Sequence, residues 1–386
     1  MNPEQGGGRR LVGPDEGRVG IEPKRRGALN GPEPLDRGVL IVGSGLLGTS
    51  LGMALRSAGV AVHLRDTDDT ALKEAVRMGA GTSDGPTRPV ALGVVAVPPA
   101  STGSVVAGLL DSGVAEYVTD VASVKELPAR EVRTLAAEPG RYVGSHPMAG
   151  REVSGPTAAL ADLFEGRPWV LCPDDRTDAQ AVTRALAVAQ TVGAAPVTMP
   201  ADEHDAAVAL VSHAPHVVAA LMAAQLSGAP DHEVRLAGQG VTDVTRVAAG
   251  DPSLWAQILG ANAEAVAGVL GKLRSGLDTV LDALSSGSGE ALRDVLAAGV
   301  TGRGRLPGKH GAAPVPYATV AVVLADEPGQ LAALFADAAR AGVNIEDVRI
   351  DHRPGQPAGL VELDVRVDAE ATLARALRGQ GWTVHE

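Results

Sequence analysis

The chain has 386 residues, a length that suits two or three domains. With 45% hydrophobic residues but only 3 Trp, 3 Tyr and 2 Phe, the core must consist mainly of Ala, Val and Leu. A net charge of −12 speaks against a nucleic-acid-binding protein, which neutralises phosphates with basic residues. The single Cys172 excludes an intramolecular disulfide and a cysteine zinc site, and it fits a cytoplasmic protein.

Residues 1–37 mix both charge signs with Gly and Pro and contain no apolar segment of a signal peptide, so we expect a disordered tail. Two uncharged stretches, 89–110 and 206–230, are long enough for membrane spans. Both contain prolines and polar side chains. We therefore expect no membrane association and interpret both as buried elements of a soluble protein.

Residues 38–199 alternate between short apolar runs and helical patterns, which predicts a doubly wound α/β domain with a parallel sheet. The expected strands lie at 38–42, 61–64, 93–97, 117–120, 169–172 and 195–198, with a further strand ending near 144. The expected helices lie at 49–57, 68–78, 101–111 and 177–192.

The loop from Gly43 to Gly48 has the form Gly-x-Gly-x-x-Gly between a strand and a helix. In this context it predicts a dinucleotide site with the pyrophosphate at the helix N-terminus. Asp66 ends the second strand, where it can bind a ribose diol and favour NAD over NADP, although Arg65 could accept a 2′-phosphate. The expected contacts are the loop and neighbouring strand ends: Gly43, Gly45, Leu46, Leu47, Gly48, Arg65, Asp66, Val97, Pro98 and Ser123.

Two further strand ends carry polar residues, in the segments 120–125 and 144–152. His146 is a candidate general base, and Ser123 could orient its ring. From the residues alone, a structural histidine in a turn is an equally good interpretation.

Residues 200–300 are rich in Ala, Val and Leu and are expected to be helical, with a long helix starting at Pro200 and Asp202. His213 and His216 fall on one helix face, and Pro215 should kink that helix. The two histidines could belong to a functional site or could be a structural pair that faces the core. No metal site is expected. Arg246 could clamp a carboxylate or lie on the surface. The low surface charge predicts that this region packs against a second subunit.

A basic Gly/Pro-rich linker is expected over 301–316, followed by a small separate domain over 317–386. Its pattern β-α-β-β-α-β predicts a ferredoxin-like α+β fold.

The motifs GVLIVGSGLLGTS, TDVASVK, GSHPMAGRE, SHAPH and DVTR, followed by a Trp, resemble those of the prephenate/arogenate dehydrogenases of tyrosine biosynthesis. The segment starting at Asp326 resembles an ACT regulatory domain. The resemblance implies that His146 and Ser123 are catalytic. It also implies a substrate pocket made of Arg246, His216, Ser212, Glu152, Asp243 and Trp255.

The implied reaction is NAD-dependent oxidative decarboxylation of prephenate, with arogenate as the alternative substrate, in a homodimer. The ACT resemblance implies an amino-acid effector such as tyrosine near Asp326, Gly329, Asn344 and Ile345, or else a stability module. Two other hypotheses remain open. One is a non-catalytic amino-acid sensor on a dehydrogenase scaffold. The other is a β-hydroxyacid-type dehydrogenase, although the Lys on which such enzymes depend is missing around 213–216.

Overall fold

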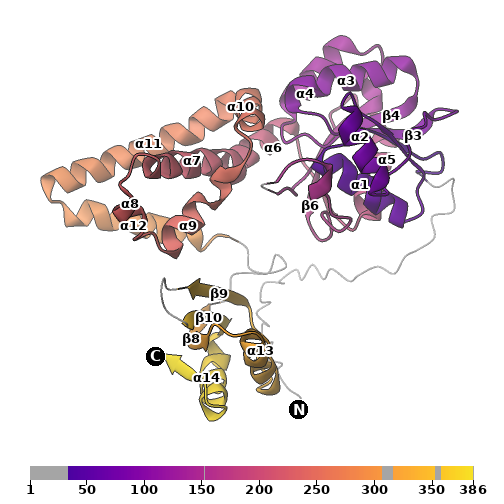
Figure 1. Ribbon diagram of the computed structural model, residues 1–386. Coiled ribbons are helices and arrows are strands. Elements are labelled where there is room, and N and C mark those ends of the chain that lie inside the picture. Colours follow the sequence, from indigo (N-terminus) through magenta and orange to yellow (C-terminus); the bar gives the residue numbers. More distant parts are fainter. Residues whose placement is uncertain (1–33, 152, 307–315, 353–357, 386) are drawn as a thin grey trace, which may run out of the picture.

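The computed structural model describes residues 34–151, 153–306, 316–352 and 358–385, which form an α/β region, a helical region and a small α+β domain (Figure 1). The expected tail lies largely outside these residues, but its last part, 34–37, forms a turn. Leu35 packs against the core, and Arg37 pairs with Glu116. Residues 34–37, which the sequence pattern assigns to the tail, therefore pack with the α/β region.

The α/β region contains one seven-stranded sheet in the order β2-β1-β3-β4-β5-β6-β7. Its strands are β1 Val39–Val42, β2 Val62–Arg65, β3 Val90–Val95, β4 Ala115–Asp120, β5 Tyr142–Pro147, β6 Pro168–Cys172 and β7 Ala195–Thr198. Its helices are α1 Leu46–Ser57, α2 Asp69–Arg77, α3 Pro99–Ser112, α4 Glu126–Leu135 and α5 Ala179–Thr191, with short 3₁₀ turns η1 Pro139–Arg141 and η2 Pro156–Ala158.

The sheet is parallel from β2 to β5, as predicted, but β5 pairs with β6 in antiparallel fashion, so a wholly parallel sheet was wrong. A parallel connection needs a crossover, usually a helix. In the described part of the segment between β5 and β6, the short η2 is the only helical element. The chain therefore returns directly and reverses the direction of β6 and of its parallel partner β7.

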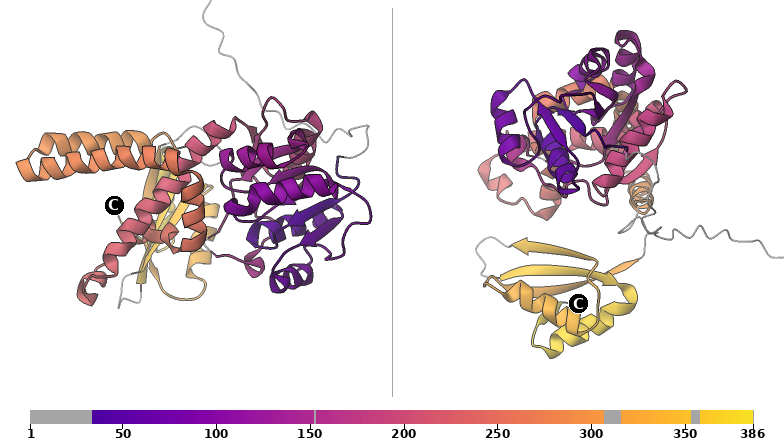
Figure 2. Two further views of the ribbon diagram at one scale, coloured as in Figure 1. Left: turned by 90° about the horizontal axis from the view of Figure 1, so that it is seen from above. Right: turned by 90° about the vertical axis from the view of Figure 1, so that its right-hand side faces the viewer.

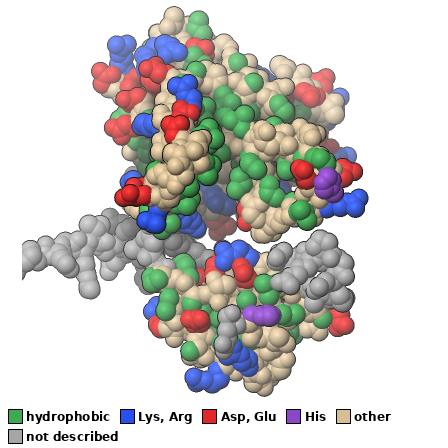
Figure 3. Space-filling view, turned by 90° about the vertical axis from the view of Figure 1, so that its left-hand side faces the viewer, with side chains coloured by type: hydrophobic (Ala, Val, Ile, Leu, Met, Phe, Trp, Pro, Cys, Tyr) green, Lys and Arg blue, Asp and Glu red, His purple; other side chains and the backbone are tan. Residues whose placement is uncertain are grey.

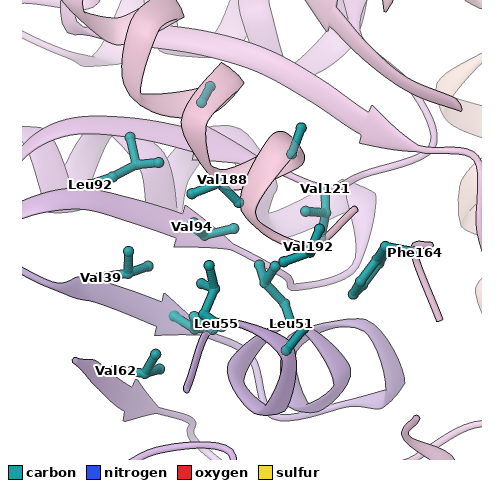
Figure 4. Packing of buried hydrophobic residues seen from close by; sticks show 14 of the residues in the cluster. Val39, Leu51, Leu55, Val62, Leu92, Val94, Val121, Phe164, Val188 and Val192 are labelled. Carbon is teal, nitrogen blue, oxygen red and sulfur yellow. The ribbon is translucent and has the colours of Figure 1, made fainter. Parts of the chain in front are cut away.

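The core between sheet and helices consists of aliphatic side chains, as the composition predicts (Figure 4). Leu51 and Leu55 of α1 meet strand residues such as Val39 and Val94, and all four are completely buried. Each such side chain contributes roughly 1.5–3 kcal/mol through burial. This packing holds the strand ends, on which the site is built, in fixed positions.

The helical region begins with α6 Ala201–Val208, continues through the π-helical turn η3 Ala209–His213 and becomes α7 Ala214–Leu226. Pro215 lies at the start of α7, where it lacks the N–H that a regular helix would use. The wider turn directly before it takes up this irregularity. The elements α8 Asp231–Val234, α9 Gln239–Thr245, η4 Arg246–Ala249, α10 Pro252–Ala261, α11 Ala263–Ser286 and α12 Gly289–Arg303 follow.

Helices α11 and α12 pack side by side and project away from the sheet (Figures 1 and 2). Since α12 continues to Arg303, the helical region extends into the stretch expected to be a linker; residues 307–315 of that stretch lie outside the described residues. Figure 3 shows hydrophobic side chains over the face that this region presents away from the sheet. Strongly exposed apolar residues are Leu210, Val211, Leu221, Leu277, Leu284, Leu296 and Val300.

Among the described residues, one helical run, Ala201–Leu226, is long and apolar enough to cross a membrane. Only 33% of its most apolar window is buried within the chain, so the expectation of a buried element is met only in part. The run also carries His204, Asp205 and His213, which are each about 1% exposed and hydrogen-bonded across to other elements. It is therefore tied into the protein core on one side.

The C-terminal domain has the predicted β-α-β-β-α-β order: β8 Tyr317–Ala325, α13 Gln330–Arg340, β9 Asp347–His352, β10 Ala358–Arg366, α14 Glu370–Gly379 and β11 Thr383–His385, with a short η6 Val367–Ala369. Its sheet order is β11-β8-β10-β9, and all pairs are antiparallel. The ferredoxin-like prediction is thus confirmed. β9 starts four residues later than expected, because residues 343–346 form an irregular approach to it.

Candidate active site

The predicted cofactor and catalytic residues of the α/β region meet at one edge of the sheet. The strands β2, β1, β3, β4 and β5 are neighbours and run in the same direction, so their carboxyl ends form a continuous rim. The glycine loop follows β1, Asp66 follows β2, Val97 and Pro98 follow β3, Ser123 follows β4, and His146 lies near the end of β5. Ligands of open α/β sheets bind at such rims.

The glycine loop has the close backbone packing that its pattern predicts. Gly43 has φ +108°, and a Cβ there would lie 2.3 Å from the carbonyl oxygen of Ala96. A Cβ on Gly48 would lie 1.9 Å from the carbonyl oxygen of Gly43. At Gly45, by contrast, a Cβ would meet nothing within 4 Å. The outer side of the loop is therefore open for a ligand, while its inner side is locked against the sheet.

The groups around this opening fit a dinucleotide. Gly45 caps α1 without a side-chain hydrogen bond, which leaves the first N–H groups of the helix available for a pyrophosphate. Asp66 accepts hydrogen bonds from the backbone N–H of Ser44 and, at 2.9 Å, of Asp68, which places its carboxylate beside the loop. The buried hydroxyl of Ser44 has no hydrogen-bond partner. Arg65 is exposed next to this site.

His146 lies on β5 with 9% of its surface exposed. Burial is the main cause that lowers the pKa of its imidazole well below 6.5, and the positive fields of His204, Lys125 and His213 act in the same direction. His146 is therefore neutral at neutral pH. A neutral imidazole at the sheet rim can accept a proton, as a general base requires.

The ring of His146 is held by residues that the sequence analysis did not single out. Its Nδ1 atom lies 2.9 Å from Nε2 of His204, and Nδ1 of His204 lies 2.7 Å from Oδ1 of Asp205. The Asp205 carboxylate also accepts the backbone N–H groups of Lys125 at 2.8 Å and Glu126 at 2.9 Å. The start of α4 thus anchors a chain of two imidazoles.

A buried ion pair, Lys125 with Asp120, connects the ends of β4 and β5. Lys125 and Asp120 are both completely buried; the Lys125 ammonium contacts the Asp120 carboxylate and donates to the Ser145 carbonyl at 2.6 Å. The Tyr142 hydroxyl donates to Asp120 at 2.7 Å, and burial followed by the Asp120 charge raises the pKa of this phenol. The end of β4 is therefore tied to β5 directly beside His146.

The Trp255 ring of α10 contacts the rings of both His213 and His216; of these three, His216 and Trp255 were predicted pocket residues. The rings of His216 and Trp255 stack at 3.5 Å with an angle of 7°, and His213 meets Trp255 edge-on at 6.2 Å. Burial lowers the pKa of His213 to about 4 and lowers that of His216 as well. Asn262 connects these rings with the chain of His146, His204 and Asp205. Its amide lies 3.2 Å from His213 Nδ1 and donates to the Asp205 backbone carbonyl at 2.8 Å.

The other predicted pocket residues are less enclosed. Arg246 and Asp243 are exposed within the single chain, and Asp243 accepts a hydrogen bond from Gln239 at 2.7 Å. A buried clamp by Arg246 is therefore not formed by this chain alone. Ser123 and Ser212 are half-buried near the rim and beside His213, respectively, and Glu152 lies outside the described residues.

No group of three or more His, Cys, Asp or Glu side chains able to hold a metal ion occurs in the described part of the chain. Sequence reasoning missed His204 and Asp205, which follow Asp202 and Glu203 in the polar first half of α6. An adjacent His–Asp pair is a weak signal for a supported imidazole, and its partners on β5 and α4 are far away in sequence.

Comparisons with known proteins agree with this arrangement. The family model described as "Prephenate dehydrogenase, nucleotide-binding domain" matches residues 51–198, and "Prephenate dehydrogenase, dimerization domain" matches residues 200–298. A protein of Streptomyces niveus named probable prephenate dehydrogenase NovF is 39% identical over 357 residues, covering 90% of this chain and 99% of that protein.

Solved structures are similar as well. The Aquifex aeolicus prephenate dehydrogenase in complex with hydroxyphenyl propionate and NAD⁺ has 28% identity and a TM-score of 0.61, covering 69% of this chain and 97% of that one. The Synechocystis arogenate dehydrogenase has 26% identity and a TM-score of 0.58, covering 69% and 98%.

Proposed function

Since the chain belongs to the prephenate dehydrogenase family, as its motifs predicted, we propose that it converts prephenate into 4-hydroxyphenylpyruvate and CO₂ with reduction of NAD. One observation carries this proposal: a neutral, buried imidazole, His146, lies on the same sheet rim as an open glycine loop. A base and a dinucleotide site that share one rim suit the removal of a proton and a hydride from one carbinol.

Each residue has a defined task in this reaction. His146 takes the proton of the ring hydroxyl, and Ser123 lies on the neighbouring strand end, where it can contact both that hydroxyl and the cofactor. The first N–H groups of α1 and the Asp66 carboxylate would hold an NAD, which would supply the hydride acceptor. Loss of the ring carboxylate as CO₂ then makes the ring aromatic, which drives the reaction.

The substrate side of the site is formed by the helical region. His216 and Trp255 present a flat, stacked surface to the ring, and Arg246 provides a guanidinium for a substrate carboxylate. Ser212, Asp243 and Glu152 complete this proposed pocket.

Prephenate is the proposed substrate, with arogenate as the competing one. The support is the name of the Streptomyces niveus relative, which is more similar than the Synechocystis arogenate dehydrogenase. The test is NADH or NADPH formation, followed by absorbance, with each substrate and each cofactor. Turnover of prephenate with NAD at least tenfold faster than any other combination supports the proposal. Preference for arogenate, or for NADP through Arg65, would refute that part of it.

We also propose that the enzyme is a cytoplasmic homodimer joined through the helical region. The exposed leucines of α7, α11 and α12 and the description of the matching family model support this. Light scattering of the full chain at micromolar concentration should give about twice the mass of one chain. A monomer would contradict the proposal.

The C-terminal domain is proposed to be an ACT module that binds an aromatic amino acid. A cavity of about 380 Å³ is lined by Asp326 and Gly329, two of the four residues expected at an effector site. Asn344 and Ile345 do not line it: Asn344 donates to Glu346, and Ile345 packs on the domain core. Calorimetry with tyrosine and phenylalanine tests this idea. Absence of heat with both would favour a purely structural module.

A further inference from the structure

In the chain from His146 through His204 to Asp205, the contacts determine which atom donates each hydrogen bond. Asp205 receives donors on every side: the N–H groups of Lys125 and Glu126 and the ring of His204. A carboxylate in this setting only accepts hydrogen bonds. Nδ1 of His204 must therefore carry the hydrogen that points to Asp205.

The tautomer of His204 in turn determines that of His146. In a neutral imidazole one nitrogen donates and the other accepts. With Nδ1 of His204 donating, its Nε2 accepts, and the atom opposite it is Nδ1 of His146 at 2.9 Å. Nδ1 of His146 then carries the hydrogen, and its Nε2 keeps the lone pair that a base needs.

We propose that His204 and Asp205 are positioning residues that fix His146 in the tautomer with a basic Nε2 and that stabilise its cationic form after proton transfer. This inference rests on the proposed function only for its kinetic consequences. The tautomer itself is a property of the free protein.

The burial of His204 and Asp205 and their contact with α4 hold the His146 ring in one position. His204 and Asp205 are each 1% exposed, and Asp205 joins the helical region to the first turn of α4 in the α/β region. A carboxylate at a helix N-terminus is favoured by the N–H groups and the positive end of the helix dipole. The same side chain thus fixes the domain contact and the base.

Other ionisable groups facing the pair are compatible with these protonation states. His213 of η3 lies on the helical side and Lys125 on the sheet side. Lys125 is engaged by Asp120. Were His204 an imidazolium instead, its Nε2–H would donate to His146, and His146 would carry its hydrogen on Nε2.

The first experiment determines the tautomer directly. Full-length protein labelled with ¹⁵N-histidine is examined by two-bond ¹⁵N–¹H correlation, with the His146 signals assigned from their loss in His146→Asn. We expect a hydrogen on Nδ1 of His146. A hydrogen on Nε2 overturns the proposal, whatever the substrate proves to be.

The second experiment uses a matched pair of variants, His204→Gln and His204→Leu. The Gln amide can donate to Asp205 and accept from His146 as the imidazole does, whereas Leu can do neither. We expect kcat of His204→Gln to stay within about tenfold of the parent, and that of His204→Leu to fall by roughly 10²–10⁴-fold with KM little changed. Equal activity of the two variants would overturn the relay.

The third variant, Asp205→Asn, replaces a carboxylate that accepts at both oxygens by a neutral amide with one oxygen acceptor and one N–H₂ donor. It loses the charge that stabilises a His146 cation and sets a donor against at least one N–H group, so we expect kcat to fall by roughly 10²–10⁴-fold. The control is Asp202→Asn, an exposed residue on the same helix. If Asp205→Asn fails to fold because α4 loses its cap, the His204 pair still decides. A parent without activity on any substrate would refute the proposed function but leave the NMR result valid.

Discussion

Replacement of His146 by Asn removes the proposed base but can keep the hydrogen bond to His204. The Asn amide nitrogen takes about the position of imidazole Nδ1, so the 2.9 Å contact with His204 can persist. No atom replaces Nε2. General-base catalysis typically contributes 10²–10⁴-fold, so we expect kcat to fall by roughly that factor, equivalent to about 3–5 kcal/mol of transition-state stabilisation.

The assay is NADH formation at saturating prephenate, with KM and the thermal unfolding midpoint measured in parallel. Both should stay close to those of the parent, since the side chain is small and its one described hydrogen bond is retained. His232→Asn, an exposed histidine on α8, is the matched control and should leave kcat unchanged. A His146→Asn variant with kcat within threefold of the parent would refute His146 as the base.

Three further predictions concern the cofactor loop, the substrate clamp and the pH dependence. Gly48→Ala places a Cβ 1.9 Å from a backbone oxygen, so we expect about 1–3 kcal/mol lower stability and much weaker NAD binding by calorimetry; Gly108→Ala, with open space around it, should be neutral. Arg246→Ala should raise KM roughly 10–100-fold, the value of a charged hydrogen bond, and unchanged KM would exclude it as the clamp. Because burial lowers the pKa of His146 well below 6.5, kcat/KM should remain constant as the pH is lowered through 6.5 and should fall only at lower pH, where His146 becomes protonated. A decrease centred above pH 6.5 would contradict this.

Local sequence determined much of the nucleotide site. The strand–glycine–helix pattern fixed the β1–α1 turn, because Gly43 needs a positive φ and Gly48 a close approach that other residues cannot provide. Residues at the ends of successive parallel strands had to meet at one rim, which brought Asp66, Ser123 and His146 together. The alternation of short apolar runs also determined the ferredoxin-like domain.

Other features could be decided only by the tertiary structure. The reversal of β6 depends on how an irregular connection crosses the sheet edge, and no residue pattern encodes that direction. The exposure of Arg246, which the residue pattern left open between a buried clamp and a surface side chain, is also a property of the folded chain. The partners of His146 come from 58 positions further along the chain, and Asp205 reaches back 80 positions to Lys125. Periodicity reports only neighbours within a few residues, whereas the tautomer of a base depends on whichever donors and acceptors folding brings within about 3 Å.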